Sequence, residues 1–438
     1  MKTTNLFALL MAITILFACN KFKDITPDYA EGPKPEKKYF KGISNQVILD
    51  WNIAAFDAMG GATYQHSLLA SRVNAMVHIA MHDALNAIGP AFETYALQTK
   101  DYQAEPISAA ASAAHRVLVA HFPDKKADLD ARLQQSLAGI PEGQPKAHGL
   151  ALGVEAANAI LALRQNDGAF ADPFGAIEPS TEPGVYQAVP PFDIIFAPFW
   201  KTMQPFGLQS PEQFRSTPQP SLTSEVYTQD YNEIKSVGQL NSQTRTAEQT
   251  SYAKFWYEFS EAGWNRVARS AISGKKLDLL TTARLFALLN MALADSYTAG
   301  WDSKFHYNFW RPYTAIRAAE NDGNGQTVAD QSWEPLMPTP PVQDYPSTHS
   351  ALGNAGATVL AAILGDNTKF TMISNTAEIP GSTRSFKSFS QAADENADSR
   401  VMAGIHFRFS CEAGQDLGNK VGKFIVENKL RPVKTSQQ

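Results

Sequence analysis

The 438-residue chain has little of several features that would assign it to a class at once. It holds only two cysteines, Cys19 and Cys411, which excludes a disulfide-stapled scaffold and a zinc site built from several thiolates. Charges are nearly balanced, with 43 Asp and Glu against 38 Lys and Arg, so the basic surface of a nucleic-acid-binding protein is excluded too. With 44 % apolar residues, the chain can still fill a large core.

Long apolar runs are also scarce, and the clearest lies close to the N-terminus. Residues 6–18 follow Lys2 and are almost wholly apolar, but they are too few for a membrane-spanning helix, which needs about 20 residues. A positive start and a short apolar run predict a signal peptide. The run ends in Leu-Phe-Ala-Cys19, which resembles a bacterial lipoprotein signal.

This resemblance implies a signal in residues 1–19 and a lipid on Cys19 that anchors the mature protein to a membrane. The implied location is the bacterial periplasm or cell surface, and an ordinary signal peptide with a chance cysteine is the alternative. Residues 20–41 are charged and contain proline, which predicts a flexible tether. No further run long enough to span a membrane follows, so no further span is expected.

Most of the remaining chain, residues 42–432, carries apolar side chains at three- and four-residue steps, which predicts helices. Strand-like alternation is scarce. The predicted fold class is therefore all-α, in two sets of helices, an N-terminal half at about 47–165 and a C-terminal half at about 223–430. The first long helix is expected to end at Gly89-Pro90. Further helices are expected over residues 107–122, 124–137, 147–164, 224–237, 246–259, 264–272, 277–310, 347–364, 392–404 or beyond, and 413–428.

The stretch between these halves, at about 166–222, has a different composition. Ten prolines between Pro173 and Pro220 exclude long helices and central strands there. Many aromatic side chains lie between the prolines, and these argue against a solvated linker. We therefore expect an ordered, irregular wrap over the helical body.

Two cations in the C-terminal half have an unusual setting. Lys304 and Arg311 are seven residues apart in Lys-Phe-His-Tyr-Asn-Phe-Trp-Arg-Pro, which predicts one helical face two turns apart. Pro312 disfavours helix at the preceding residue, so Arg311 is expected at or just past the helix end. The aromatic surroundings suit a site, although basic side chains extended from an exposed helix are the plain alternative.

Two further segments carry groups that could handle an oxyanion. Pro346-Ser347-Thr348-His349 opens an apolar helix, whose free backbone N–H groups attract anions. A capping serine with an incidental histidine is the alternative. The other segment, Ser-Arg400 to His406, places its two side chains about 120° apart on a straight helix, so they can meet only if the helix bends near Gly404 or Arg400 lies in a preceding turn.

Together, the three segments resemble the signature K-x6-R-P, P-S-G-H and S-R-x5-H of the type 2 phosphatidic acid phosphatase superfamily. This superfamily includes bacterial acid phosphatases, lipid phosphatases and vanadium-dependent haloperoxidases. Residues 72–88, 245–249 and 283–317, together with the chain length, are similar to the bacterial vanadium haloperoxidase-like branch. The resemblance implies two helical bundles of the haloperoxidase and acid phosphatase type, with the wrap between them.

The resemblance also implies a cofactor, vanadate, and a reaction. His406 would bind the vanadium axially, or in a phosphatase would be the nucleophile that forms a phosphohistidine. His349 would be the general acid or base. Hydrogen peroxide and a halide would be the substrates, with bromide or iodide favoured over chloride and an organic acceptor as a further candidate.

The same resemblance assigns the cradle of the oxyanion. Lys304, Arg311 and Arg400 would neutralise its equatorial oxygens, and the two arginines can do so with bidentate geometry. Ser347 and the backbone N–H of Thr348 would complete the cradle.

Two positions depart from the family pattern. Thr348 replaces the glycine of P-S-G-H, which keeps the amide N–H but adds a side chain that could crowd the pocket. Ser410 stands where the acid phosphatases have an aspartate four residues after the last histidine. A serine can accept a hydrogen bond from the imidazole but supplies no charge, which counts against phosphatase chemistry.

Two other activities stay open at this stage. The first is an acid or lipid phosphatase acting through His406, and the second is a surface binding protein with a degenerate oxyanion site. Assembly into a homo-oligomer is a further expectation. Cys411 lies five residues after His406, and on a continuous helix it would point about 140° away from it, as a buried structural thiol.

Two weaker patterns suggest metal ions. His78 and His82 are four residues apart on one expected helix face, but a third ligand is lacking, so a packing helix is the better interpretation. The acidic loop from Glu320 to Asp330 hints at calcium. Counted from Asp322, the position that needs a bidentate glutamate is a tryptophan, so a turn is predicted instead.

Overall fold

The computed structural model describes residues 37–61, 66–374 and 381–433. The predicted signal segment and Cys19 lie outside this range. The described chain is mostly helical with a few short strands, so the all-α prediction is confirmed. No helix within the described ranges combines the length and the apolar character needed to cross a bilayer.

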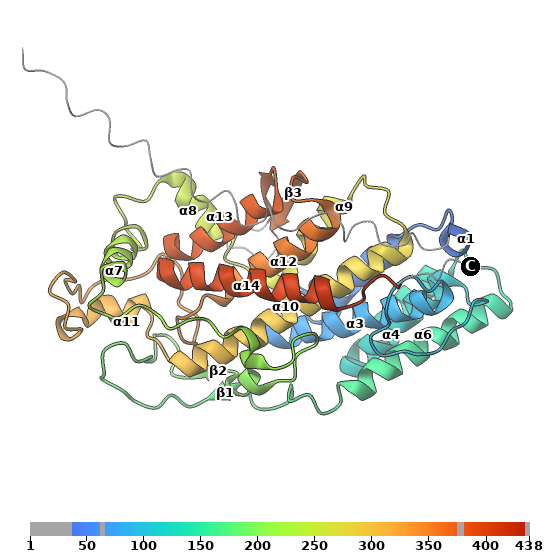
Figure 1. Ribbon diagram of the computed structural model, residues 1–438, viewed down its shortest axis with the longest axis horizontal. Coiled ribbons are helices and arrows are strands. Elements are labelled where there is room, and N and C mark those ends of the chain that lie inside the picture. The colour runs from blue at the N-terminus through green and yellow to red at the C-terminus, as the bar shows by residue number, and fades with distance from the viewer. Residues whose placement is uncertain (1–36, 62–65, 375–380, 434–438) are drawn as a thin grey trace, which may run out of the picture.

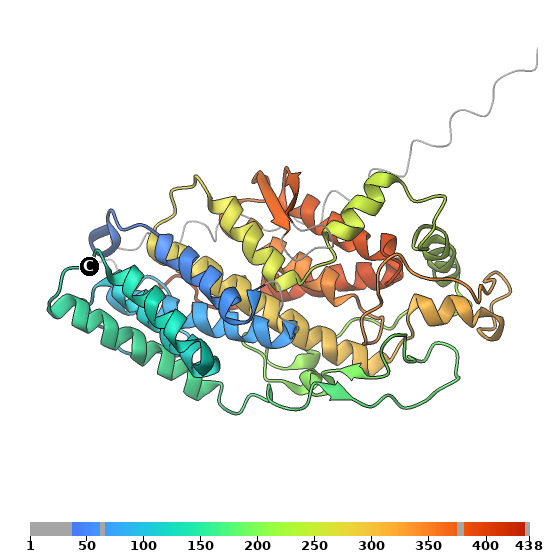
Figure 2. The same cartoon turned by 180° about the vertical axis from the view of Figure 1, so that it is seen from behind.

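A first bundle gathers at one end of the elongated molecule, at the right in Figure 1 and at the left in Figure 2. Its central helix α3 is buried along almost its whole length, mostly by apolar side chains. The buried face also carries polar side chains, namely Arg72, Asn74, His78, His82, Asp83 and Asn86. Helix α4 begins at Pro106, where the carboxylate of Glu105 accepts hydrogen bonds from the first free N–H groups. The bundle comprises α1 (Lys37–Phe40), α2 (Gln46–Ala58), α3 (Ser67–Ile88), α4 (Pro106–His121), the short 3₁₀ helix η3 (Pro123–Lys125), α5 (Lys126–Leu137) and α6 (Gln144–Leu163).

Helix α10 (Leu279–Tyr307) joins the two bundles. It starts at the Asp278 cap, whose carboxylate accepts from Thr281 N–H, and it is buried along almost its whole length. It packs on α3 of the first bundle and on α12 and α14 of the second, and Figure 1 shows it running from one to the other. Asn308 ends it in a left-handed conformation at φ 47°, three residues earlier than the predicted helix end.

The second bundle is built around α12, which packs against α14, α10 and α13. The contact with α14 is close because glycines face it. A Cβ on Gly414 would lie 2.1 Å from the carbonyl oxygen of Ser347, so a side chain there would force the helices apart. The elements are α7 (Glu225–Val237), α8 (Ala247–Phe255), α9 (Ser260–Ile272), α11 (Pro312–Arg317), the 3₁₀ helix η6 (Ala319–Asn321), α12 (Thr348–Leu364), α13 (Phe389–Met402) and α14 (Arg408–Asn428).

The proline-rich stretch is the predicted ordered wrap. It contains the two-residue strands β1 (Phe174–Gly175) and β2 (Ile195–Phe196), which pair antiparallel, and the 3₁₀ helices η4 (Pro198–Thr202) and η5 (Pro211–Phe214). Buried Asp295 of α10 holds it down by accepting hydrogen bonds from the N–H groups of Phe206, Gly207 and Leu208 at 2.6–2.8 Å. A single inward-facing carboxylate thus satisfies three consecutive amides of a segment that forms no regular ladder.

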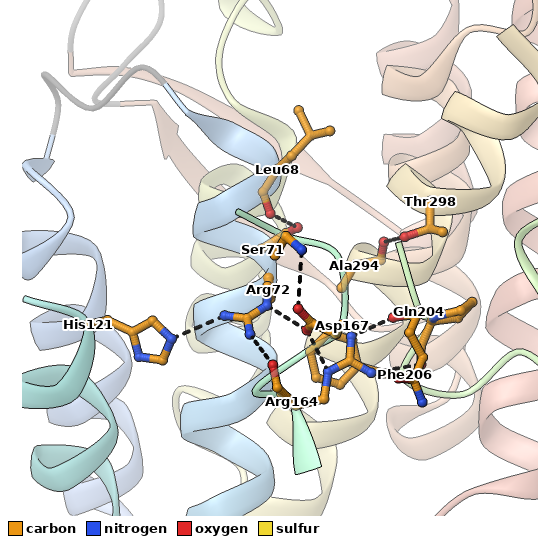
Figure 3. A network of polar contacts seen from close by, with 12 residues as sticks. Leu68, Ser71, Arg72, His121, Arg164, Asp167, Gln204, Phe206, Ala294 and Thr298 are labelled. Atoms are coloured by element: carbon orange, nitrogen blue, oxygen red, sulfur yellow. Dashed lines mark hydrogen bonds and ion pairs between the residues drawn. The ribbon is translucent and has the colours of Figure 1, made fainter. Parts of the chain in front are cut away.

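A buried ion cluster fixes the start of the wrap to the first bundle (Figure 3). The Nε atoms of Arg72 and Arg164 both donate to one carboxylate oxygen of Asp167, at 2.7 and 2.8 Å. Arg72 also approaches His121 of α4, and Arg164 donates to the carbonyl of Pro205 further along the wrap. Each charge is out of water, so the cluster is stable only while all members are present.

We expect Asp167→Asn to destabilise the protein by about 2–3 kcal/mol, because two buried guanidinium groups would then share a neutral acceptor. Denaturant unfolding would measure this difference. Asp193→Asn is the matched control, since that carboxylate lies exposed on the same wrap, and it should change stability by no more than about 0.5 kcal/mol. Equal losses in the two variants would contradict the cluster's role.

Two further features differ from the sequence prediction. Strands β3 (Phe370–Ser374) and β4 (Ser382–Phe386) form an antiparallel hairpin with Phe370 opposite Phe386, which was not predicted. Residues of β3 alternate between buried and exposed, but the strand is only five residues long, which is too short for a clear sequence pattern. The helix predicted from residue 392 begins earlier, at Phe389, and stops at Met402, because Gly404 turns the chain at φ 79°.

Candidate functional site

Three cations from three separate elements meet in the second bundle. Lys304 lies in the last turn of α10, Arg311 is the residue that precedes α11, and Arg400 lies in the last turn of α13. Each is at most 4 % exposed. The prediction that Arg311 sits just past a helix end is confirmed, and the break at Asn308 means that the two motif cations do not share one helix.

Backbone carbonyl groups hold two of these cations in place. Nζ of Lys304 donates to the carbonyl oxygens of Gln343 and Asp344, at 2.6 and 3.0 Å. Nε of Arg311 donates to the Val342 carbonyl at 2.7 Å. The proline-rich segment before α12 therefore provides the acceptors that orient the cations of the first motif.

Arg400 is held differently. Its Nη1 donates to the carbonyl of Trp256 at 3.4 Å, and its guanidinium lies 5.5 Å from the ring centre of Tyr257, which favours a cation electrostatically. Nε of Arg400 finds no acceptor among the described residues, although it is buried. A buried donor without a partner costs free energy that a bound acceptor would recover.

His406 lies in the turn between α13 and α14. Gly404 makes this turn, and a Cβ on Gly404 would lie 2.3 Å from the Gly238 carbonyl oxygen, so the chain passes here only as glycine. Both conditions named for the two side chains to meet are therefore fulfilled, since the chain turns at Gly404 and Arg400 lies in the last turn of the preceding helix α13. Nε2 of His406 lies 3.1 Å from Nη1 of Arg311, and its Nδ1 lies 2.9 Å from Oδ1 of Asp344.

The electrostatic setting keeps His406 neutral. Burial, followed by the charges of Arg311, Lys304 and Arg400, lowers the pKa of His406 well below its usual value. A neutral imidazole keeps a lone pair for an electrophile or a metal. Burial raises the pKa of Asp344 to about 6, against the opposing effect of Arg311 and other donors, so this carboxyl group is ionised at neutral pH.

His349 is tied to the segment that joins α8 to α9. Its Nε2 donates to the Trp256 carbonyl at 2.8 Å, and Oγ of Ser260 lies 2.9 Å from its Nδ1. Burial and the charge of Arg400 lower the pKa of His349 well below its usual value. The Trp256 carbonyl thus accepts from both His349 and Arg400, which brings the second and third motifs together.

Ser347 and Thr348 lie where α12 begins. Ser347 is the cap, as predicted, and its Oγ is 3.4 Å from Ser350 N–H. The Thr348 side chain packs on α10, since a Cβ on Gly300 would lie 2.6 Å from Cγ2 of Thr348. The extra side chain at position 348 therefore occupies room that a glycine on the neighbouring helix leaves open.

This fit predicts a coupling between the two positions. Gly300→Ala should destabilise the protein when residue 348 is threonine and should be tolerated after Thr348→Gly, because the methyl groups then no longer meet. We expect a coupling free energy of about 1–2 kcal/mol in a double-mutant cycle measured by denaturant unfolding. Additive effects of the two substitutions would show that the side chains do not share this space.

The site as a whole has the character of an oxyanion receptor. Burial and the charge of Arg311 lower the pKa of Lys304 well below its usual value, and burial lowers that of Arg400 to about 10. Asp344 is the carboxylate that faces this group, so the cations outnumber it. A tetrahedral anion such as vanadate or phosphate fits this donor set, because it would compensate the excess charge and give Nε of Arg400 an acceptor.

Sequence reasoning missed three contributors to the site. These are Asp344, the Trp256 carbonyl and Ser260, which touch His406, Arg400 and His349. Asp344 left a faint signal as an acidic residue among apolar and proline residues just before the second motif. A backbone carbonyl leaves none.

The direction of Cys411 relative to His406 differs from the prediction. Helix α14 starts at Arg408, so no continuous helix relates Cys411 to His406, and the expected 140° separation has no basis. The thiol is buried, as predicted, but it lies close enough to Lys304, Arg311 and Arg400 to interact with their charges. Burial raises its pKa to about 12, so it is a neutral, unreactive thiol.

The residues of the two weaker metal-ion patterns contact other groups of the protein. Nε2 of His78 lies 2.8 Å from Nδ2 of Asn52, and Nδ1 of His82 lies 3.0 Å from the carboxylate of Asp83. Asp322 accepts hydrogen bonds within its own turn. No group of three or more His, Cys, Asp or Glu side chains suited to a metal ion occurs in residues 37–61, 66–374 and 381–433.

Comparisons with known proteins point in the same direction. A family model described as the VCPO second helical-bundle domain matches residues 284–435, which contain all three motifs. The vanadium chloroperoxidase of Curvularia inaequalis is 28% identical over 293 residues, 52% of this chain and 48% of that protein. The match thus spans about half the length of this curated relative.

Solved structures match over more of the chain. The crystal structure of the first bacterial vanadium-dependent iodoperoxidase has a TM-score of 0.78 at 25% identity, covering 90% of this chain and 99% of its own. A bacterial vanadium-dependent chloroperoxidase in its holo form has a TM-score of 0.65 at 16% identity, covering 82% and 91%. The second likeness shows the fold alone.

Proposed function

Because the chain is a vanadium haloperoxidase-like protein of the type 2 phosphatidic acid phosphatase superfamily, we propose that it binds vanadate and oxidises a halide with hydrogen peroxide. The observation that carries the proposal is the group of buried cations around a neutral histidine, with one buried guanidinium donor left without a partner. When bound, vanadate would supply the Lewis-acid centre that activates the peroxide toward the halide.

The chain's own residues would hold the anion. His406 would offer a ring nitrogen to the metal, because its lowered pKa keeps the lone pair free. Lys304, Arg311 and Arg400 would bind the oxygens, and Arg400 would use the Nε that has no other acceptor. Ser347 and the backbone N–H of Thr348 would donate from the start of α12.

His349 would move a proton at the edge of this group. Its neutral ring can accept a proton at Nδ1, where the Ser260 hydroxyl now lies, and the Trp256 carbonyl holds the proton on Nε2. Lys304, Arg311, Arg400 and His406 are buried, and charges out of water interact more strongly than exposed ones.

Iodide is the first halide to test. The support is the similarity to the bacterial iodoperoxidase, which covers 99% of that chain at 25% identity. Bromide comes second, ahead of chloride.

A phosphatase remains the second candidate, and one observation favours it. The missing acid at position 410 had counted against it, but Asp344 supplies a carboxylate at Nδ1 of His406 from a different part of the chain. The same cations would accept a phosphoryl group, and neutral His406 would be the nucleophile.

One experiment separates these activities. Protein lacking residues 1–19 is incubated with orthovanadate and assayed for iodide and bromide oxidation by peroxide, with and without prior removal of vanadate. Vanadate-dependent oxidation supports the proposal. Hydrolysis of a chromogenic phosphate that vanadate inhibits would replace it with the phosphatase, and a protein that binds neither anion would have a degenerate site.

We further propose that Cys19 carries a lipid and anchors the protein to a bacterial membrane, facing the periplasm or the exterior. The support is the signal-like sequence before it. Cys19→Ala should move the protein from the membrane fraction to the soluble fraction and abolish labelling by a fatty-acid analogue. If the wild type and the Cys19→Ala variant were distributed alike between the two fractions, the lipid anchor would be refuted, and residues 1–19 would be interpreted as an ordinary signal peptide.

A further inference from the structure

We propose that Asp344 is the positioning residue of His406 and that Ser410 holds Asp344 in place. The inference deepens the proposed function, because it concerns how the anion-binding histidine is oriented. It assigns a role to two side chains whose contacts were not visible in the sequence.

Asp344 is fully buried and fixed on every side. Its N–H donates to the Phe309 carbonyl at 3.0 Å, and its own carbonyl accepts from Nζ of Lys304 at 3.0 Å. Its side-chain Oδ2 accepts from Oγ of Ser410 in a short hydrogen bond. The carboxylate therefore has one orientation, set by α14 on one side and by the α10–α11 connection on the other.

The second oxygen is directed at the histidine. Oδ1 of Asp344 lies 2.9 Å from Nδ1 of His406, whereas Nη1 of Arg311 is 3.8 Å away from it. Oδ1 accepts no hydrogen bond of regular geometry. A rotation of the imidazole that brings Nδ1–H into line with Oδ1 would complete this hydrogen bond, and the bond would fix the proton on Nδ1.

The consequence falls on the other ring nitrogen. With the proton on Nδ1, Nε2 carries the lone pair, and Nε2 is the nitrogen 3.1 Å from Arg311. Nη1 of Arg311 also lies 3.4 Å from Nδ1, so the guanidinium sits beside the ring, and the lone pair is left on the nitrogen that does not face the carboxylate. A carboxylate that orients a ligating histidine in this way also raises the basicity of the ring.

Ser410 completes the device. It lies in the first turn of α14, four residues after His406, and its backbone carbonyl accepts from Ser347 N–H at 2.8 Å. The hydroxyl of Ser410 therefore touches Asp344, the backbone of Ser410 touches the second motif at Ser347, and Asp344 touches the third motif at His406. The carboxylate beside His406 belongs to Asp344, and the hydroxyl of Ser410 only holds that carboxylate in place through a hydrogen bond.

The test uses vanadate binding, measured by calorimetry without peroxide or halide, together with kcat and KM for iodide. Asp344→Asn should weaken vanadate binding about 10- to 100-fold, the usual effect of losing a partner of a metal-binding histidine. Ser410→Ala should have a smaller effect. Asp322→Asn is the control, because it removes a buried carboxylate that is held within its own turn.

A swap distinguishes positioning from mere stability. In Asp344→Ala with Ser410→Asp, the new carboxylate starts beside the old one, since the two side chains already touch. We expect the swap to restore vanadate affinity to within about threefold of wild type, whereas Asp344→Ala alone stays weak. Vanadate affinity that is unchanged in Asp344→Asn, or weak in the swap although its unfolding transition is intact, would overturn the proposal.

The two proposals fail separately. A wild-type protein that binds vanadate but oxidises no halide would refute the proposed function, and the affinity series would still decide the role of Asp344. A wild-type protein that oxidises iodide beside an Asp344→Asn variant of equal vanadate affinity would refute the positioning role alone.

Discussion

The His406→Ala variant is expected to lose vanadate-dependent iodide oxidation by about 1000-fold or more while it remains folded. Nε2 of this side chain lies 3.1 Å from Nη1 of Arg311, and the charges of Lys304 and Arg400 act on the same ring, so the imidazole is placed among the three cations. Alanine removes the lone pair and leaves the cations where the backbone carbonyls hold them. Steady-state oxidation of iodide, with thermal unfolding measured in parallel, checks the result.

His306→Ala is the matched control for this variant. His306 lies between the two motif cations in sequence, yet it is exposed, and its ring contacts Tyr307 at a centroid distance of 4.7 Å. Its removal should leave activity within about twofold of wild type. More than about a tenth of wild-type activity in His406→Ala would exclude this histidine both as the metal ligand and as a phosphatase nucleophile.

The second large effect is expected from Gly404→Ala. A side chain at φ 79° is strained by about 1–2 kcal/mol, and its Cβ would in addition lie 2.3 Å from the Gly238 carbonyl oxygen and 2.9 Å from Cβ of Pro335. The turn must then shift, and His406 follows it two residues later. We expect a loss of about 4 kcal/mol of stability together with most of the activity.

Gly365→Ala separates the two causes of that loss. Gly365 ends α12 at φ 81°, but a Cβ there meets nothing within 4 Å. It should cost only the backbone strain, about 1–3 kcal/mol, and leave activity unchanged. If denaturant unfolding gave the same loss for both variants, the close approach of Gly404 to Gly238 would have no energetic weight.

Much of the helical layout could be predicted, because apolar spacing reports which face of a helix is buried. Helix α12 is an example, because its cap at Ser347 and its apolar run to Leu364 can both be predicted from the sequence. The proline-rich wrap was predictable for the opposite reason, since proline excludes the alternatives. The β3–β4 hairpin was not, because five-residue strands carry too little pattern.

The site was predictable as a set of residue types but not as a geometry. Motif spacing could not tell that α10 ends at Tyr307 or that the chain turns at Gly404, because both depend on backbone conformations that tertiary contacts decide. Position 410 was expected to contact the imidazole of His406, but Asp344 does so, for a related reason. Which of two residues carries the charge beside His406 depends on how the segment before α12 lies against α14, and no local rule fixes that.

The course of α10 through both bundles has a practical consequence for anyone who trims the protein. The stretch that matches the family model begins at residue 284, inside a helix that starts at Leu279. A fragment cut there would lose the Asp278 cap and expose the apolar side of α10 that α3 now covers. The half that carries the three motifs is therefore not a separable module. The first bundle contributes none of the proposed site residues, but it shields and steadies the helix that carries Lys304.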